Sequence, residues 1–170
     1  MTETMPNDDD CEEEDYGPSL AMPPLYMLRT AARCPECGRA QHVYTLGCAA
    51  FHDAGDLRPV EDFHFLRLIH SVPEPVLSLL KDRCPGYYLD RTEPDETPYL
   101  MNHCPCGAKL DDDYLNGDIG AAFWPDTPEG YGRFKLFHLP IDEAVPVECS
   151  CMLGGGEYLA FDHVKPWTEL

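Results

Sequence analysis

The sequence is short of positive charge. Its 170 residues contain 12 lysines and arginines against 31 aspartates and glutamates, which gives a formal net charge of −19. Eight of the acids lie within the first sixteen residues, and the remaining 23 acids and 12 bases still leave a charge of −11. Direct binding to nucleic acid needs lysine and arginine to displace counterions from phosphate. The composition therefore argues against a nucleic-acid surface and favours a basic protein partner.

Long apolar runs are also missing. No stretch approaches the roughly 20 apolar residues that a membrane-spanning helix needs. The first sixteen residues are acidic and contain no apolar core of the kind a signal peptide carries. We therefore predict a cytoplasmic protein that does not enter a membrane. In a reducing compartment its nine cysteines are expected to bind metal rather than form disulfides.

Familiar catalytic motifs are absent as well. The chain contains no His-Glu-x-x-His pair, and no His-x-Glu followed by the Pro-Cys-x-x-Cys of nucleobase deaminases. The glycine run "GGGE" at 154–157 lacks the lysine of a phosphate-binding loop. The sequence thus predicts that the protein is not an enzyme.

Two segments carry cysteines beside proline and glycine, "RCPECGR" at 33–39 and "NHCPCGA" at 102–108. A tight turn of this kind supplies two of the four ligands of a tetrahedral zinc ion. Cys34 and Cys37 have the usual Cys-x-x-Cys spacing, which makes them the firmest ligand prediction. The second segment is one residue short, so its pair is either Cys104 with Cys106 or, at the full spacing, His103 with Cys106. We predict one Zn²⁺ site and favour the two cysteines.

Four further cysteines leave two interpretations open. A second Cys-x-Cys pair, Cys149 and Cys151, could join Cys48 and Cys84 around another metal ion. Alternatively, these side chains are small buried hydrophobic groups, because unpaired cysteine is among the most buried residue types. The sequence does not decide between the two.

The order of patterns along the chain predicts its architecture. Residues 1–24 combine like charges with glycine and proline and are predicted to be a disordered acidic tail, followed by a single zinc-stapled domain over 25–170. Alternating apolar residues predict a strand over 63–70, and an apolar stripe behind prolines predicts a helix over 73–83. The expected fold class is α+β and β-rich, with antiparallel strands around a zinc-ribbon-like centre and one or two short helices.

The chain also resembles a group of short bacterial proteins with an N-terminal "CWKCG"-like knuckle, an "HYRLDYS"-like stretch, and then "NHCxxCG" and "GGAFFP". The matching segments here are "CPECG" at 34–38, "YYLDRT" at 87–92 and "MNHCPCGAKLDDDYLNGDIGAAFWP" at 101–125. The resemblance implies a shared zinc-ribbon-like fold, with Cys34, Cys37, Cys104 and Cys106 at the ligand positions.

Acidity and zinc together suggest a function. We expect an interaction protein that binds and neutralises a basic partner, such as an immunity protein against an antibacterial, nuclease-like toxin. The alternatives are a zinc-ribbon module of a transcription or nucleic-acid-handling assembly and, less favoured, a metal-dependent enzyme. The candidate partner surface combines carboxylates with aromatic side chains: Asp111, Asp112, Asp113, Tyr114, Asp118 and Trp124. The same segment is equally consistent with a solvated acidic turn over a core aromatic.

Overall fold

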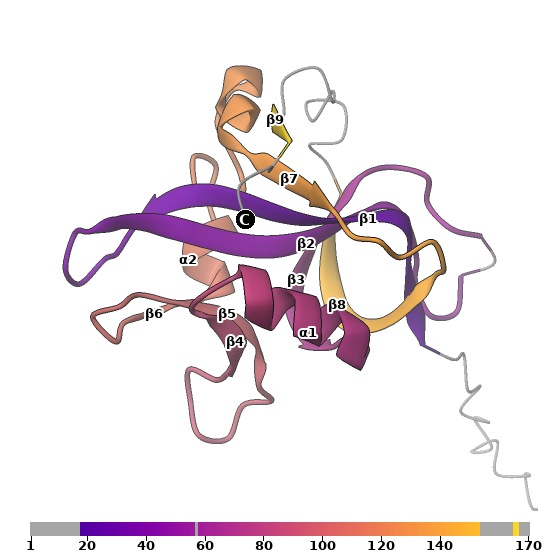
Figure 1. Cartoon of the computed structure of the whole chain (residues 1–170), viewed down its shortest axis with the longest axis horizontal. Helices are drawn as coiled ribbons and strands as arrows, with labels where there is room; N and C mark the ends of the chain where they lie inside the picture. The colour runs from indigo at the N-terminus through magenta and orange to yellow at the C-terminus, as the bar shows by residue number, and fades with distance from the viewer. Residues whose placement is uncertain (1–17, 57, 154–164, 167–170) are drawn as a thin grey trace, which may run out of the picture.

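The computed structural model describes residues 18–56, 58–153 and 165–166 of the chain. Strands dominate, joined by two short α-helices and one 3-10 helix within these residues (Figure 1). The elements in chain order are β1 (Ser19–Arg33), β2 (Ala40–His52), β3 (His64–Ser71), α1 (Glu74–Arg83), β4 (Tyr87–Asp90), β5 (Tyr99–His103), β6 (Lys109–Leu110), α2 (Asp112–Asn116), η1 (Pro128–Arg133), β7 (Lys135–His138), β8 (Val145–Leu153) and β9 (Lys165–Pro166).

A long hairpin of β1 and β2 forms the backbone of the fold. The two strands pair antiparallel from Leu20 opposite His52 to Arg33 opposite Ala40. The register shifts once, between Met22 and Leu25, where two consecutive prolines have no N–H to donate to the ladder. The hairpin carries the first cysteine knuckle at its tip, far from the rest of the barrel (Figure 1).

Four strands close into a small antiparallel barrel. β1 pairs with β2, β2 with β3, β3 with β8, and β8 returns to the start of β1. The edge of β1 opposite β2 is shared, because β8 pairs with residues 19–21 and β7 with residues 26–29. β9 then adds to β7 in parallel. The predicted antiparallel, strand-rich fold is confirmed, whereas the closure of the barrel was not predicted.

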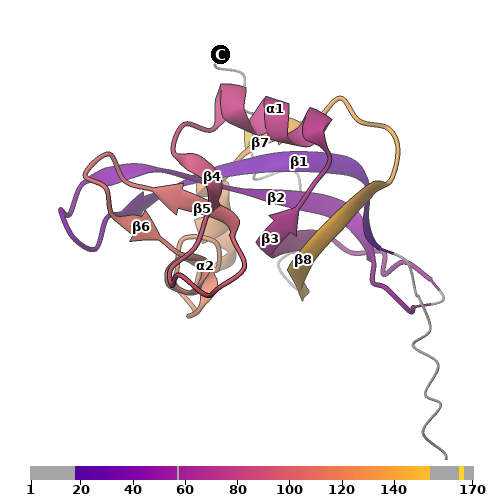
Figure 2. The same ribbon diagram turned by 90° about the horizontal axis from the view of Figure 1, so that it is seen from below.

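The main hydrophobic core lies where the barrel meets α1. Val76 and Leu80 are the buried positions of α1, and both pack into the cluster formed by the barrel strands. Figure 2 shows α1 along one side of the β1–β2 ribbon and β3 and β8 on the other. The predicted strand over 63–70 and helix over 73–83 are confirmed by β3 and α1.

A second, three-stranded sheet in the order β4-β5-β6 carries the other cysteine knuckle. A separate cluster of buried side chains joins it to the hairpin, and this cluster includes Leu110, Leu115, Phe123 and Phe134. Both sheets contribute to both clusters, because Tyr87 and Leu100 of the small sheet belong to the main core and Phe65 of β3 belongs to the second cluster. No helix among the described residues is long and apolar enough to cross a membrane.

The described structure starts earlier than the predicted domain boundary. β1 begins at Ser19, within the range 1–24 that the composition assigned to an acidic tail. Apolar residues such as Leu20 and Ala21 extend the strand to this point, because they pair with β2 and β8. The predicted disorder of residues 1–17 lies outside the described residues.

Candidate metal centre

The four cysteines of the two knuckles come together at one end of the molecule. Their sulfurs all lie within 4.8 Å of one another. The Sγ atoms of Cys34 and Cys106 are 3.7 Å apart, and those of Cys37 and Cys104 are 3.6 Å apart. A tetrahedral zinc ion with bonds of about 2.3 Å to sulfur separates its ligands by about 3.8 Å. The spacing of the sulfurs therefore fits a single zinc ion with four thiolates.

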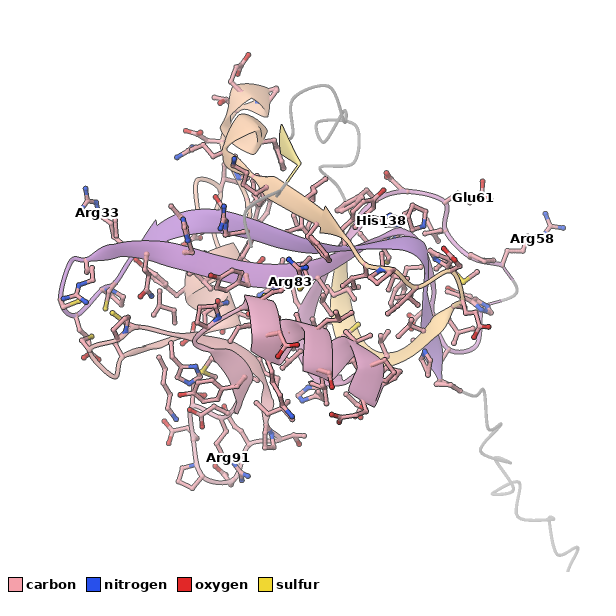
Figure 3. The ribbon with its side chains drawn as sticks, in the orientation of Figure 1. Arg33, Arg58, Glu61, Arg83, Arg91 and His138 are labelled. Atoms are coloured by element: carbon pink, nitrogen blue, oxygen red, sulfur yellow. The ribbon has the colours of Figure 1, made fainter. Side chains whose placement is uncertain are left out.

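The first knuckle is the turn between β1 and β2. The amide of Cys34 donates to the carbonyl of Arg39, and the amide of Gly38 donates to the carbonyl of Cys34, both at 2.9 Å. Gly38 has a φ of 70°, a left-handed conformation that glycine adopts without strain. Figure 3 shows Arg33 beside this tip, at the far end of the hairpin. The turn thereby holds its two cysteines on the same side of the tip.

The second knuckle repeats this scheme with one residue fewer. The amide of Cys104 donates to the carbonyl of Ala108, and the amide of Gly107 donates to the carbonyl of Cys104, both at 2.8 Å. Gly107 also has a positive φ, at 96°. Both hydrogen bonds span one residue less than their counterparts in the first knuckle. The shortened spacing is therefore absorbed by a tighter turn, and Cys104 and Cys106 remain paired.

Asn102 fixes the second knuckle relative to the first. Its side chain accepts a hydrogen bond from the amide of Tyr44 at 2.8 Å and donates one to the carbonyl of Tyr44 at 2.9 Å. Tyr44 lies in β2, on the edge of the strand that faces away from β1, and Asn102 is fully buried there. One amide side chain thus takes the place of a neighbouring strand and sets the distance between the two hairpins.

His103 does not join the cysteine cluster. Its Nδ1 lies 3.1 Å from the carbonyl oxygen of Gly86, and its Nε2 lies 2.9 Å from a carboxylate oxygen of Asp90. The ring stacks on Tyr88 with centroids 3.9 Å apart. Because both ring nitrogens already face acceptor oxygens, His103 supports the end of β5. Among the alternatives left open by the sequence, the structure places Cys104 with the other three cysteines.

Asp90 anchors this support from β4. Besides His103 it contacts the ammonium group of Lys109, with 3.0 Å between Nζ and the carboxylate. The hydrogen bond from His103, followed by those from the amide of Arg91 and from Lys109, holds the pKa of Asp90 well below its usual range. The carboxylate is consequently charged at neutral pH and braces both strands that flank the knuckle.

The close spacing of the four thiols favours the binding of a cation. The hydrogen bond from the amide of Cys37 lowers the pKa of the Cys34 thiol to about 7. The amide of Cys106 acts in the same direction on Cys104, but burial and the neighbouring sulfurs outweigh it and raise the pKa of Cys104 to about 12. Without a cation, one thiolate forms easily and disfavours the next. A bound dication removes this repulsion and deprotonates all its thiol ligands.

The other cysteines whose side chains are described do not assemble a second group. Cys48 and Cys84 are buried in the main core, where the Cys84 sulfur lies 3.6 Å from the sulfur of Met27. Burial raises the pKa of Cys84 to about 12, which keeps it a neutral thiol. Among the described side chains, Cys34, Cys37, Cys104 and Cys106 are the one set of three or more candidate ligands. The side chain of Cys151 lies outside the described residues.

The predicted partner surface is corrected at Asp112. This carboxylate is only 8% exposed, and it accepts a hydrogen bond from the amide of Leu68 at 2.6 Å. Leu68 has a φ of 46° in an irregular part of β3, so its amide points inward and needs an acceptor. Burial raises the pKa of Asp112 to about 6. A partner cannot contact a side chain that the protein itself encloses.

Its neighbours have structural contacts but remain on the surface. Asp111 caps α2 by accepting from the amide of Tyr114, and Asp113 pairs with Arg67 at 3.3 Å. Tyr114 is 45% exposed and donates to the carbonyl of Arg33, and Trp124 is 38% exposed. Asp118 is exposed as well. The predicted role of these five residues in partner binding stays a prediction.

Several supporting residues were not found by sequence reasoning. Asn102, Tyr44, Asp90 and Gly86 hold the second knuckle in place through contacts between residues distant in sequence. The only local signal was the dipeptide "NH" directly before Cys104.

No known protein family, no curated protein sequence and no solved structure matches the chain.

Proposed function

We propose that the protein is an acidic interaction protein whose binding surface is held in shape by one structural zinc ion. The observation that carries the metal assignment is the cluster of four sulfurs at tetrahedral spacing. Each pair comes from a β-hairpin turn, which is the arrangement of a zinc-ribbon-like centre. Four thiolates fill the coordination sphere of zinc, so the ion would have no position left for a reacting water. This supports a structural and non-catalytic role.

Zinc would join two parts of the fold that already share a cluster of buried side chains at this end. The first knuckle belongs to the barrel and the second to the β4-β5-β6 sheet, and Cys104 follows Cys37 by 67 positions in the sequence. Asn102 already sets the spacing of the two hairpins. The metal would convert this spacing into a fixed connection, so that a surface built from both sheets keeps one shape.

The charge of the chain supports a basic protein as the partner. Acids exceed bases by 19 overall and by 11 outside the first sixteen residues. Such a surplus accelerates encounter with a positively charged surface and repels nucleic acid. An immunity protein that blocks the positive cleft of an antibacterial, nuclease-like toxin would have these properties.

The metal assignment is tested by elemental analysis of purified protein. We expect one zinc per chain, lost in the Cys34→Ser/Cys104→Ser double variant. Cys84→Ala is the matched control, because it removes a buried thiol outside the cluster and should leave the zinc content unchanged. Wild-type protein without metal, or a double variant that retains it, would refute the zinc centre.

The partner assignment is tested by identifying the protein that copurifies with the chain and measuring the association rate at increasing ionic strength. Steering between opposite charges weakens once the screening length falls to a few ångströms, near 1 M salt. We expect a basic partner and an association rate that falls steeply with salt. An acidic partner, or a rate that does not respond to salt, would contradict this part of the proposal while leaving the zinc centre intact.

A further inference from the structure

One stretch of β1 keeps an open edge beside the first knuckle. The peptide groups of a strand point alternately to its two sides. The carbonyl of Leu25 accepts from the amide of Leu139 on the β7 side, while the amide of Cys34 donates to Arg39 on the β2 side. The odd-numbered residues of this part of β1 therefore face away from β2. Ala31 and Arg33 belong to this set.

Among the described strands, none covers that edge beyond Arg29. β7 pairs with β1 from Tyr26 to Arg29, and its last pair joins Arg29 to Lys135. The chain before Lys135 forms η1 instead of continuing the strand. Within the described residues, the N–H and C=O of Ala31 have no backbone partner. The carbonyl of Arg33 is occupied by the hydroxyl of Tyr114 at 2.7 Å.

The open edge forms one wall of a pocket of about 340 Å³. Residues 30–33 of β1 line one side, and Tyr114, Gly130 and Arg133 lie on the others. The pocket gives access to the unpaired peptide groups. An extended segment of another chain can therefore enter it and hydrogen-bond to Ala31 as an added strand.

The charge of this pocket is opposite to that of the protein. Arg33 and Arg133 are two of only 12 bases in the chain, both are exposed, and no acidic residue of the described part of the chain lines the pocket. Guanidinium groups bind carboxylates through paired hydrogen bonds. A second copy of the chain is a poor occupant, because pairing two such edges would bring four arginines together. The basic partner proposed above is disfavoured here for the same reason.

We propose that the edge of β1 at residues 30–33 binds an extended, acidic segment of a partner protein. The segment adds to the sheet through backbone hydrogen bonds to Ala31 and places carboxylates against Arg33 and Arg133. This site is separate from the surface for a basic partner, and it gives the protein a second binding activity of opposite charge preference.

The proposal is tested with a fluorescent peptide of alternating valine and glutamate, whose binding to the full chain is followed by anisotropy. We expect Arg133→Glu to weaken binding by about tenfold or more, because it replaces a charge-assisted contact by repulsion. Ala31→Pro should weaken it similarly, since proline removes the N–H on the open edge without touching the ladder to β2. Arg58→Glu is the matched control, because Arg58 is exposed in a loop far from Arg33 (Figure 3) and should bind as wild type.

Three modified peptides separate strand addition from charge attraction. Two of them are methylated on alternate backbone nitrogens, one at the odd and one at the even positions, and one of these two should lose binding. The third has lysine in place of glutamate and should not bind. Equal losses in Arg58→Glu and Arg133→Glu, or full binding of both methylated peptides, would overturn the proposal. So would binding that appears only after removal of residues 1–16, which would assign the edge to the acidic start of the chain itself.

Discussion

The two knuckles differ by one residue in the loop and far more in what supports them. In both, the first cysteine is buried, at 2% exposure for Cys34 and 4% for Cys104, and the second is exposed. In both, a glycine with positive φ follows the second cysteine. The first knuckle depends on the backbone ladder of the β1–β2 hairpin. The second ends a short hairpin and depends on two side chains of β5, Asn102 at the backbone of β2 and His103 at Asp90 of β4.

Loop length therefore matters less for the position of the sulfurs than the contacts that support each turn. A tight turn can lose one residue if it keeps its closing hydrogen bonds and its glycine, since these determine where the sulfurs lie. A short hairpin has too few ladder hydrogen bonds to fix its position. The hydrogen bonds of Asn102 and His103 fix the position of β5 instead. Substitutions around the two knuckles test this difference in support.

Removing a buried sulfur should have the largest effect. We expect Cys104→Ser to lose zinc and to lower the free energy of unfolding by more than about 4 kcal/mol, the range reached when a metal site is lost. Hydrogen exchange should accelerate most in β5 and β6, because their own pairing is short. Chelation of wild-type protein should give the same exchange pattern. Faster exchange in the β1–β2 tip alone would contradict the proposed difference in support.

Asn102→Ala should come next, with a loss of about 2–5 kcal/mol measured by urea unfolding. The change leaves the buried N–H and C=O of Tyr44 without partners, and each unsatisfied group costs about 1–3 kcal/mol. Asn102→Asp is the informative companion, because it keeps the acceptor but sets a carboxylate against the Tyr44 carbonyl. It should be at least as destabilising. A neutral effect of both would show that the two hairpins keep their spacing without this contact.

His103→Phe should have a moderate effect, about 1–3 kcal/mol, because it retains an aromatic ring over Tyr88 but removes the hydrogen bonds to Gly86 and Asp90. The zinc content should stay at one per chain, since His103 lies outside the sulfur cluster. Elemental analysis beside thermal unfolding checks both points. Loss of the metal in this variant would make His103 a candidate ligand again.

The smallest effect should come from the two glycines. Gly38→Ala and Gly107→Ala should each cost about 1 kcal/mol, the price of a left-handed conformation for a residue with a Cβ. An added Cβ meets no atom within 4 Å at either position, so packing contributes nothing and the two values should agree. Thermal unfolding of the pair measures the difference directly. A much larger loss at Gly107 would show that the shorter turn is strained.

Local patterns in the sequence were sufficient for the ligands and for single elements. Cysteines beside proline and glycine marked both knuckles, and apolar spacing marked β3 and α1. Closure of the barrel was beyond such reasoning, because it depends on β8 returning to both β1 and β3 across most of the chain. The burial of Asp112 was missed for the same reason. Its acceptor role arises from the backbone of Leu68, 44 residues away.

That buried carboxylate couples folding to proton uptake. Burial raises the pKa of Asp112 from 3.8 to about 6. Between these values the folded chain holds a proton on Asp112 that the unfolded chain has released. The contribution of this group to stability is therefore fully present below pH 3.8 and declines as the pH rises toward 6. In a protein with so many acids, Asp112 is a site where mild acidification favours the folded state.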